Sequence, residues 1–128
     1  MTMERYHEVW RLYSEQGVEA FLAQCTDDLI AEEYAGAPGA AVWHGRDGLR
    51  EMYARWEQDF EDFLFEPTGE PVQISAEAVA RPVRVRGKGR MSGVEVDWNL
   101  IMVTVLREGL VAHQFLADSM EEARARVA

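Results

Sequence analysis

The chain has 128 residues, a formal net charge of −10 at pH 7 and a single cysteine, Cys25. This length is enough for one domain with a core of its own, so we expect a single domain over residues 1–128. The negative charge repels phosphate backbones and anionic lipids, which argues against a nucleic-acid partner and against membrane binding. A lone cysteine excludes an internal disulfide and a metal site built from cysteines.

The first ten residues, MTMERYHEVW, carry charges where a secretory signal requires an apolar run. Nowhere does the sequence contain the roughly 18 consecutive apolar residues that a membrane-spanning helix requires. We therefore expect a cytoplasmic protein.

Two helices are predicted at the start of the chain. Apolar residues recur at helical intervals in the first of them: Tyr6, Val9, Trp10 and Tyr13. Gly17 stands where a left-handed residue would end this helix. A shorter helix follows over residues 18–25, and Cys25 on its apolar side is expected to be a core residue rather than a nucleophile. A short strand at residues 29–34 and a loop of small residues at 35–41 come next.

A third helix is expected within residues 42–63. Large apolar residues occupy one face of it: Leu49, Met52, Tyr53, Trp56 and Phe60. Asp47 is the predicted N-cap. The apolar face covers either an ordinary core or the wall of a ligand cavity.

After Phe63 the pattern changes to that of a meander of strands. Strands are predicted over residues 64–66, 72–74, 79–88, 94–106 and 111–117, and a brief helix follows them. Pro82 cannot donate a ladder hydrogen bond, so its strand is an edge there or carries a bulge. Helices followed by strands predict an α+β fold, in which three N-terminal helices pack on one face of a curved, mainly antiparallel sheet.

The order of these elements, with particular residues at the joints between them, resembles the SnoaL-like polyketide cyclase family of the NTF2-like superfamily. The joints that carry the resemblance are Gly17, Asp27-Asp28, Trp43-His44-Gly45-Arg46-Asp47-Gly48, Ser92-Gly93-Val94-Glu95-Val96, Leu106-Arg107-Glu108-Gly109 and Phe115-Leu116-Ala117-Asp118. The resemblance implies a cone in which helices and a curved sheet enclose an apolar pocket, commonly in a homodimer joined through the sheets. The family includes cyclases, isomerases, dehydratases and proteins that only bind a ligand or assemble, so the fold does not settle the function.

By the same resemblance, Asp118 at the end of the last predicted strand takes the place of the acid/base aspartate of the cyclases. Such a carboxylate removes a proton next to a carbonyl group without a metal or a cofactor, so we expect neither. Asp118 can instead cap the C-terminal helix, because Glu121 and Glu122 follow Asp118 or Ser119 at capping-box spacing. Both roles stay open.

Two strands supply the other polar candidates. Strand alternation puts Gln114 and Leu116 on the same side as Asp118, where Gln114 can hydrogen-bond a substrate carbonyl. On the first strand either Glu32 or Glu33 points inward. Glu33 is the better match to the polar cavity residue of related enzymes, and the alternative for it is a solvated strand carboxylate.

Five aromatic residues complete the expected binding pocket: Tyr13, Tyr34, Trp43, Tyr53 and Trp56. Aromatic side chains suit a flat, mostly apolar molecule, and packing in an ordinary core is the alternative for each of them. Trp98 is expected either in the same wall or on the outer sheet face, where it would contact a second copy of the chain.

Basic residues alternate with valines and glycines from Arg81 to Arg90, which favours a strand with one solvated face over a site for an anion. In the epoxide-hydrolase branch of the family, an arginine and an aspartate occupy the places where this chain has Val83 and Val85. This departure argues against epoxide hydrolysis unless Arg81 and Arg84 take those places through a shift of register.

The leading hypothesis is a cofactor-independent enzyme of the cyclase, isomerase or dehydratase type, with Asp118 as its base. Its ligand would be small, largely apolar, and cyclic or polyketide-like. The alternative is a non-catalytic module that binds a small ligand or dimerises through the sheet. The expected partners are therefore a small apolar molecule and a second copy of the chain.

Overall fold

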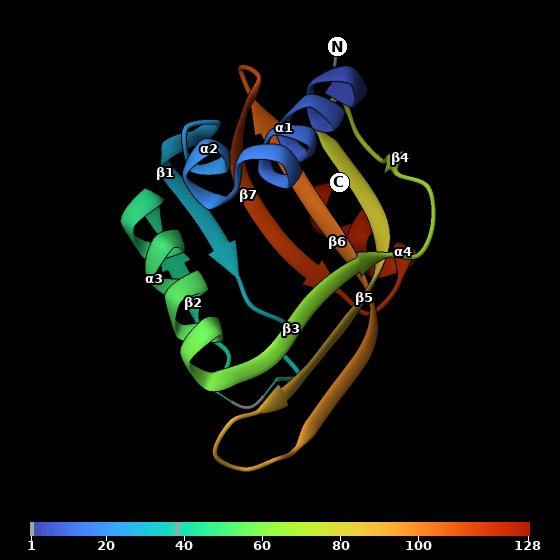
Figure 1. Cartoon of the computed structure of the whole chain (residues 1–128). Coiled ribbons are helices and arrows are strands. Elements are labelled where there is room, and N and C mark those ends of the chain that lie inside the picture. The colour runs from blue at the N-terminus through green and yellow to red at the C-terminus, as the bar shows by residue number, and fades with distance from the viewer. Residues whose placement is uncertain (1, 38) are drawn as a thin grey trace.

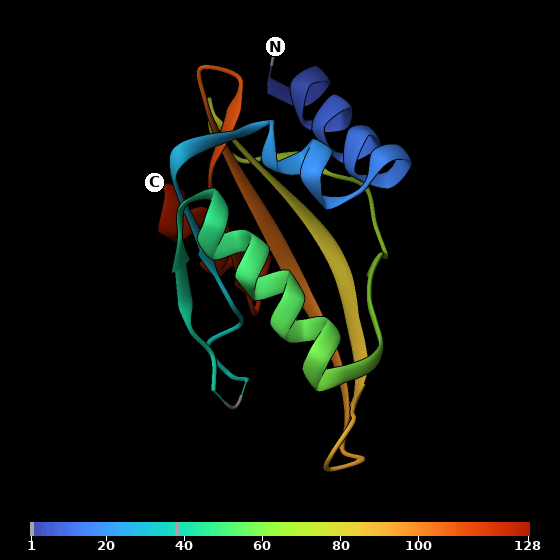
Figure 2. The same cartoon turned by 60° about the vertical axis from the view of Figure 1, so that its left-hand side comes forward.

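The strands of this protein form a curved sheet with helices on both of its faces (Figure 1 and Figure 2). The computed structural model describes residues 2–37 and 39–128, so Met1, and Pro38 in the predicted loop 35–41, lie outside the described residues. The helices are α1 (Thr2–Gln16), α2 (Val18–Leu22), α3 (Gly45–Asp59) and α4 (Met120–Val127). The strands are β1 (Cys25–Glu32), β2 (Val42–His44), β3 (Phe60–Pro67), β4 (Val72–Gln73), β5 (Ala78–Gly89), β6 (Glu95–Arg107) and β7 (Leu110–Ala117). Among the described residues, no helix has both the length and the apolar character needed to span a membrane.

The strand order is β2-β1-β7-β6-β5-β3, and β4 pairs with β5 beside this path. Neighbouring strands are antiparallel except for β1 and β7, which run parallel. The helices α1, α2 and α3 pack on the inner face, and α4 packs on the outer face. This arrangement confirms the predicted α+β fold, with three N-terminal helices on a curved, mainly antiparallel sheet, and α4 is the brief helix predicted after the strands.

Both N-terminal helices are present, but the second is shorter than predicted. Gly17 ends α1 in the left-handed region with a φ of 87°, as its position indicates. The second helix ends at Leu22 rather than at Cys25. The Val111 N–H donates to the Gln24 carbonyl at 2.8 Å, and this contact draws the chain into the sheet, so Cys25 begins β1.

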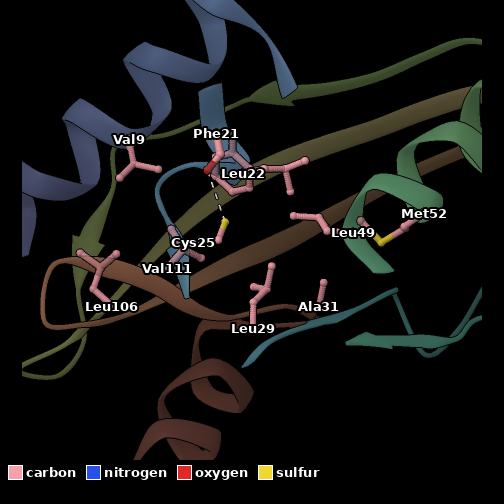
Figure 3. Close-up of a cluster of buried hydrophobic side chains, with 10 residues drawn as sticks. All are labelled: Val9, Phe21, Leu22, Cys25, Leu29, Ala31, Leu49, Met52, Leu106 and Val111. Carbon is pink, nitrogen blue, oxygen red and sulfur yellow. Dashed lines mark hydrogen bonds between the residues drawn. The ribbon is translucent and has the colours of Figure 1, made fainter. Parts of the chain in front are cut away.

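Cys25 is buried at the junction of α2 and β1 (Figure 3). Its thiol donates a hydrogen bond to the Phe21 carbonyl at 3.4 Å. Burial raises the pKa of the Cys25 thiol to about 12, so the thiol stays protonated and is a poor nucleophile. The residue belongs to the core, as expected, but on a strand rather than a helix.

The third helix begins later than predicted because the residues before it form a strand. Val42–His44 is β2, which pairs antiparallel with β1. The helix α3 follows at Gly45, which has a φ of 76°. His44 occupies the N-cap position, so the prediction of Asp47 as the N-cap is wrong. Asp47 lies in the first turn instead and pairs with Arg50, with 2.6 Å between the carboxylate and the guanidinium.

Pro82 lies at a break in the pairing on one side of β5. The strand β4 pairs with residues 79–80 and β3 pairs with residues 83–89, so neither strand pairs with Pro82. The Pro82 carbonyl accepts from the Thr68 N–H at 2.9 Å, and the Pro82 nitrogen points the same way, into the gap. The missing N–H therefore costs no bond between β5 and β6, and the predicted edge at Pro82 is confirmed.

The sheet divides the core into two layers. The three N-terminal helices cover the inner layer, whose fully buried residues include Val9, Phe21, Leu29 and Leu49 (Figure 3). On the outer face, Ala123 of α4 packs against a second cluster on β5, β6 and β7. Small side chains in that cluster let the helix approach the sheet closely: Ala78, Ala80 and Ala117.

Ser119 is the N-cap of α4. Its hydroxyl oxygen accepts a hydrogen bond from the Glu122 N–H at 3.1 Å. The Glu122 carboxylate in turn accepts from the Asp118 N–H at 2.9 Å, so two backbone donors at the start of the helix are satisfied. The Asp118 carboxylate takes no part in this cap, and the alternative of Asp118 as the capping side chain is wrong.

Glu32, at the end of β1, joins the first strand to the last helix. Arg126 Nη2 on α4 lies 2.9 Å from Glu32 Oε2, and the same oxygen contacts Nε2 of His113 on β7. Burial raises the pKa of Glu32, but hydrogen bonds from His113 and Arg126 outweigh this effect and leave the pKa below its usual value. The ionised carboxylate therefore stabilises the packing of α4.

We expect Ser119→Ala to lower the free energy of unfolding by about 1 kcal/mol, because the Glu122 N–H loses its side-chain acceptor. Chemical denaturation followed by circular dichroism measures the loss. Asp118→Ala is the control and is expected to cost less, since the Asp118 carboxylate is exposed and accepts from the Tyr34 hydroxyl. A larger loss in Asp118→Ala would contradict the assignment of the cap.

The contacts of Glu32 also predict a pH dependence. Its pKa in the folded chain lies below the unfolded value of about 4.3, so its stabilisation is complete above that value and is lost as the pH falls through the folded pKa. We expect Glu32→Gln to be less stable than the wild type near neutral pH, and the difference to shrink in strongly acidic buffer. Urea unfolding across this range measures it, and a difference that grows toward low pH would contradict the prediction.

Candidate functional site

A cavity of about 470 Å³ lies between the inner face of the sheet and the helices α1 and α3. Seven phenylalanine, tyrosine and tryptophan residues line it: Tyr6, Trp10, Tyr13, Tyr53, Trp56, Phe65 and Phe115. Apolar residues of the sheet complete its wall: Ala31, Val83, Met102 and Leu116. The cavity is therefore largely apolar, with polar groups at a few positions.

Helical spacing sets the aromatic residues of the two helices in this wall. On α1, Trp10 follows Tyr6 by four residues and Tyr13 follows Trp10 by three, which keeps all three on one face. Tyr53 and Trp56 lie one turn apart on α3. The rings meet edge to face, with centroids 5.6 Å apart for Trp10 and Tyr13 and 5.3 Å apart for Tyr53 and Trp56. These contacts fix the orientation of the rings.

Glu33 is a cavity carboxylate that two indole groups hold in place. Trp43 Nε1 donates to Oε1 at 2.6 Å, and Trp56 Nε1 donates to Oε2 at 3.3 Å. Glu33 follows directly after β1, and its N–H still donates to the Ala41 carbonyl at 3.1 Å, so the alternation of the strand extends to Glu33 and sends Glu32 and Glu33 to opposite faces. Glu32 also borders the cavity, but its carboxylate bonds to residues of β7 and α4 on the outer side. Of the two glutamates, Glu33 therefore presents its carboxylate inward.

The Tyr53 and Tyr6 phenols of the cavity stay protonated. Burial raises the pKa of Tyr53 well above its ordinary value, and the neighbouring Tyr13 raises it further. Burial also raises the pKa of Tyr6, although the nearby Arg81 guanidinium offsets part of this rise. Both phenols are neutral near pH 7, so each can donate a hydrogen bond to a ligand.

Arg81 brings a guanidinium group into the same cavity from β5. Its Nε donates to the Gly69 carbonyl at 3.0 Å. Alternation along β5 puts Arg81 on the face of Val83, whereas Arg84 and Arg86 lie on the other face and pair with carboxylates there. The solvated face predicted for residues 81–90 is thus the face of Arg84 and Arg86, and Arg81 belongs to the opposite one.

Gln114 and Leu116 line the cavity from β7, but Asp118 does not. The strand ends at Ala117, so its alternation no longer governs Asp118, which lies at the turn into α4. The Asp118 carboxylate is exposed and accepts a hydrogen bond from the Tyr34 hydroxyl at 2.7 Å. The expectation that Asp118 lies beside the pocket is therefore wrong.

Two aromatic residues predicted for the wall, Tyr34 and Trp43, are not among the residues that line the cavity. Trp43 packs against the inner core and contacts the cavity group Glu33 through its indole N–H. Tyr34 packs against Trp98, with ring centroids 5.1 Å apart, in a cluster that includes Val85 of the inner face. Trp98 therefore lies on the inner face of the curved sheet. The alternative, which places Trp98 on the outer face at a contact with a second copy of the chain, is wrong.

The sequence-based prediction of the site lacks several residues of the cavity, among them Tyr6, Trp10 and Arg81. The signal for Arg81 was present, because Arg81 and Val83 are two residues apart on a strand and share a face. For Tyr6 and Trp10 the helical period predicts a buried face. The helical period does not show whether this buried face lines a solid core or a cavity, because the answer depends on which elements lie opposite the helix.

One protein family and several solved structures are similar to this chain. The SnoaL-like domain family matches residues 3–114. No curated protein matches the chain in sequence. Among solved structures, an NTF2-like protein from Burkholderia thailandensis is similar at 17% identity and a TM-score of 0.76, over 88% of this chain and 86% of that chain.

Two further solved structures are similar over nearly the whole chain. A SnoaL-like protein from Mesorhizobium loti has 18% identity and a TM-score of 0.70, over 91% of this chain and 98% of that one. A Mycobacterium tuberculosis protein in complex with estradiol-17β-hemisuccinate has 13% identity and a TM-score of 0.69, over 94% of this chain and 95% of that one. At these identities the similarity shows the NTF2-like fold alone, whereas the family match spans most of the sequence. The chain belongs to the SnoaL-like domain family.

Proposed function

We propose that the cavity binds a small, largely apolar, cyclic molecule. Its volume of about 470 Å³ falls within the usual range of small-ligand pockets, about 300–1,000 Å³. The aromatic side chains of α1 and α3 offer flat apolar surface to such a molecule. The Mycobacterium tuberculosis protein of the same fold was solved with estradiol-17β-hemisuccinate, which supports a ligand of this kind.

The observation that carries this proposal is the Glu33 carboxylate in a largely aromatic wall. Trp43 and Trp56 each donate one N–H to a different oxygen of Glu33, which fixes the carboxylate in place. A carboxylate has about four lone-pair positions, so each oxygen can accept a further hydrogen bond. A hydroxyl or amino group on the ligand can donate this further hydrogen bond to Glu33. The bond sets the orientation of the ligand in the cavity.

Acid/base chemistry is the second candidate function, and the position of Glu33 favours it. A carboxylate in an apolar cavity can take a proton from a carbon next to a carbonyl group and return it to the enolate. Cyclases and isomerases share this step. Asp118, which the resemblance to the cyclases suggests as the base, lies outside the cavity, so Glu33 is the better candidate.

The homodimer joined through the sheet and the cytoplasmic location remain predictions. Trp98 is not available to a contact on the outer face, because it packs against Tyr34 on the inner one. The outer face of β5 carries ion pairs instead, with Arg84 Nη2 2.7 Å from Asp97 Oδ2. A second copy on that part of the sheet would therefore meet a charged surface.

We expect Glu33→Gln to weaken the binding of 2-naphthol, a flat probe with one hydroxyl group, about tenfold. A hydrogen bond to a charged group contributes about 1.5–3 kcal/mol, and 1.4 kcal/mol corresponds to a factor of ten. Binding of naphthalene, which has no hydroxyl, is expected to change little. Quenching of tryptophan fluorescence measures both affinities, because Trp10 and Trp56 line the cavity.

Glu32→Gln is the matched control for this experiment. Its carboxylate bonds to His113 and Arg126 on the outer side, so its loss is expected to leave both affinities unchanged. Equal weakening of 2-naphthol and naphthalene in Glu33→Gln would argue against a hydrogen bond from the ligand to Glu33. Failure of the wild type to bind either probe would contradict the proposed binding function.

The acid/base candidate is tested with 2-tetralone, a flat apolar ketone. We expect the wild type in heavy water to accelerate deuterium exchange at the carbons next to the carbonyl, measured by proton NMR. Glu33→Gln is expected to lose the acceleration and Asp118→Asn to keep it, because only the first removes a cavity carboxylate. Loss of the acceleration in Asp118→Asn but not in Glu33→Gln would assign the role of the base to Asp118. If the wild type does not accelerate the exchange, the acid/base function is ruled out.

A further inference from the structure

We propose that the ligand carries a carboxylate or an equivalent oxyanion, and that Arg81 binds this group at the β5 side of the cavity. This inference rests on the proposed function, because it requires that the cavity holds a ligand. It adds a second polar contact to that of Glu33 and names the chemical class of the ligand as an organic anion with a cyclic apolar body.

Arg81 differs in its surroundings from the other partly buried arginines of the described chain. Arg5 lies 3.4 Å from a carboxylate, Arg84 lies 2.7 Å from one, and Arg86 contacts one. Among the described residues, no carboxylate lies within ion-pair distance of Arg81, whose Nε bonds to the Gly69 carbonyl. The guanidinium group also hydrogen-bonds the Tyr6 phenol, a neutral partner, so its charge is left for a ligand anion to compensate.

A partly buried guanidinium without a counter-ion is costly. Arginine cannot relieve this cost by losing its proton, and placing a cation in an apolar wall is unfavourable unless an anion compensates it. The chain has a net charge of −10, so carboxylates are abundant, yet none in the described part of the chain lies within ion-pair distance of Arg81. A ligand carboxylate supplies the missing charge, and the planar fork of arginine matches its two oxygens.

Two neutral donors on α1 line the same cavity. The Tyr6 phenol, protonated because burial raises its pKa, lies near enough to Arg81 for the guanidinium to oppose that rise. Trp10 Nε1 is buried and has no hydrogen-bond partner among the described residues. An oxyanion can accept a hydrogen bond from the Tyr6 phenol as well as from the guanidinium.

The other charged groups of the lining do not take over this role. Arg11 is exposed and already pairs with Glu15 at 2.8 Å. Glu33 would repel an anion, but it follows β1, which is separated from β5 by β7 and β6 in the sheet. Three strand spacings amount to about 14 Å along the sheet, so a ring system can lie between the two contacts.

The test compares two probes of the same shape, 6-hydroxy-2-naphthoate and 6-hydroxy-2-naphthamide, by isothermal titration calorimetry with the full chain. We expect the wild type to bind the naphthoate about tenfold more tightly than the amide, the difference that a charge-assisted hydrogen bond provides. Arg81→Gln is expected to abolish this preference, because it weakens the binding of the naphthoate more than that of the amide. Arg81→Lys, which keeps the charge and loses the fork, is expected to retain part of it.

Arg84→Gln is the matched control, because Arg84 lies on the same strand but faces outward and pairs with Asp97. It is expected to keep the wild-type preference. Circular dichroism verifies the folding of each variant, and Arg81→Lys still tests the proposal if Arg81→Gln does not fold.

Two results would overturn the role of Arg81. The first is equal affinity of the wild type for both probes, and the second is an unchanged preference in the Arg81 variants. In either case binding of the amide would leave the proposed function standing. Failure of the wild type to bind either probe would overturn both proposals, so the two failures are distinguishable.

Discussion

The parallel pairing of β1 with β7 is the contact on which the cavity depends. It joins Cys25 to Val111 and Ala31 to Gln114, so it brings the early part of the chain against the last strand. The strand β1 also carries β2, and α3 packs over it. One long-range pairing therefore places Glu33, the indole groups that hold it and the aromatic face of α3 around the same space.

The two charged groups of the cavity are stabilised in different ways. Glu33 receives hydrogen bonds from two neutral indole donors, so its charge is stabilised without a cation. Arg81 donates to the Gly69 carbonyl and has no carboxylate beside it among the described residues. Because β7 and β6 separate the strands that carry them, Glu33 and Arg81 do not neutralise each other. Each charge stays available to a bound molecule, which is what a site that orients its ligand requires.

Glu32, the last residue of β1, and Glu33, the residue after it, serve opposite faces of the sheet. Glu32 binds Arg126 of α4 and His113 on the outer side, and Glu33 faces the cavity. The alternation of a strand explains the division, since neighbouring side chains point to opposite faces. The packing of the last helix and the polarity of the cavity are thus linked through β1.

Periodicity in the sequence predicted the order of the elements except for β2, and the facing of residues inside several of them. It predicted the end of α1 at Gly17 and the shared face of Gln114 and Leu116. Periodicity did not predict the facing of a residue that lies just beyond the end of a strand. Asp118 lies one residue beyond β7, and the cap at Ser119 turns the chain away from the strand's alternation.

The sequence by itself determined the α+β fold, the SnoaL-like family and the apolar faces of the helices, because these depend on local spacing and on residues at the joints. Only the tertiary structure decided that Glu33 rather than Asp118 is the cavity carboxylate, and that Arg81 lies opposite α1 instead of in solvent. The physical reason is that a cavity is bounded by elements far apart in the chain. Their relative positions come from the pairing of β1 with β7 and the packing of α1 and α3, which no local pattern specifies.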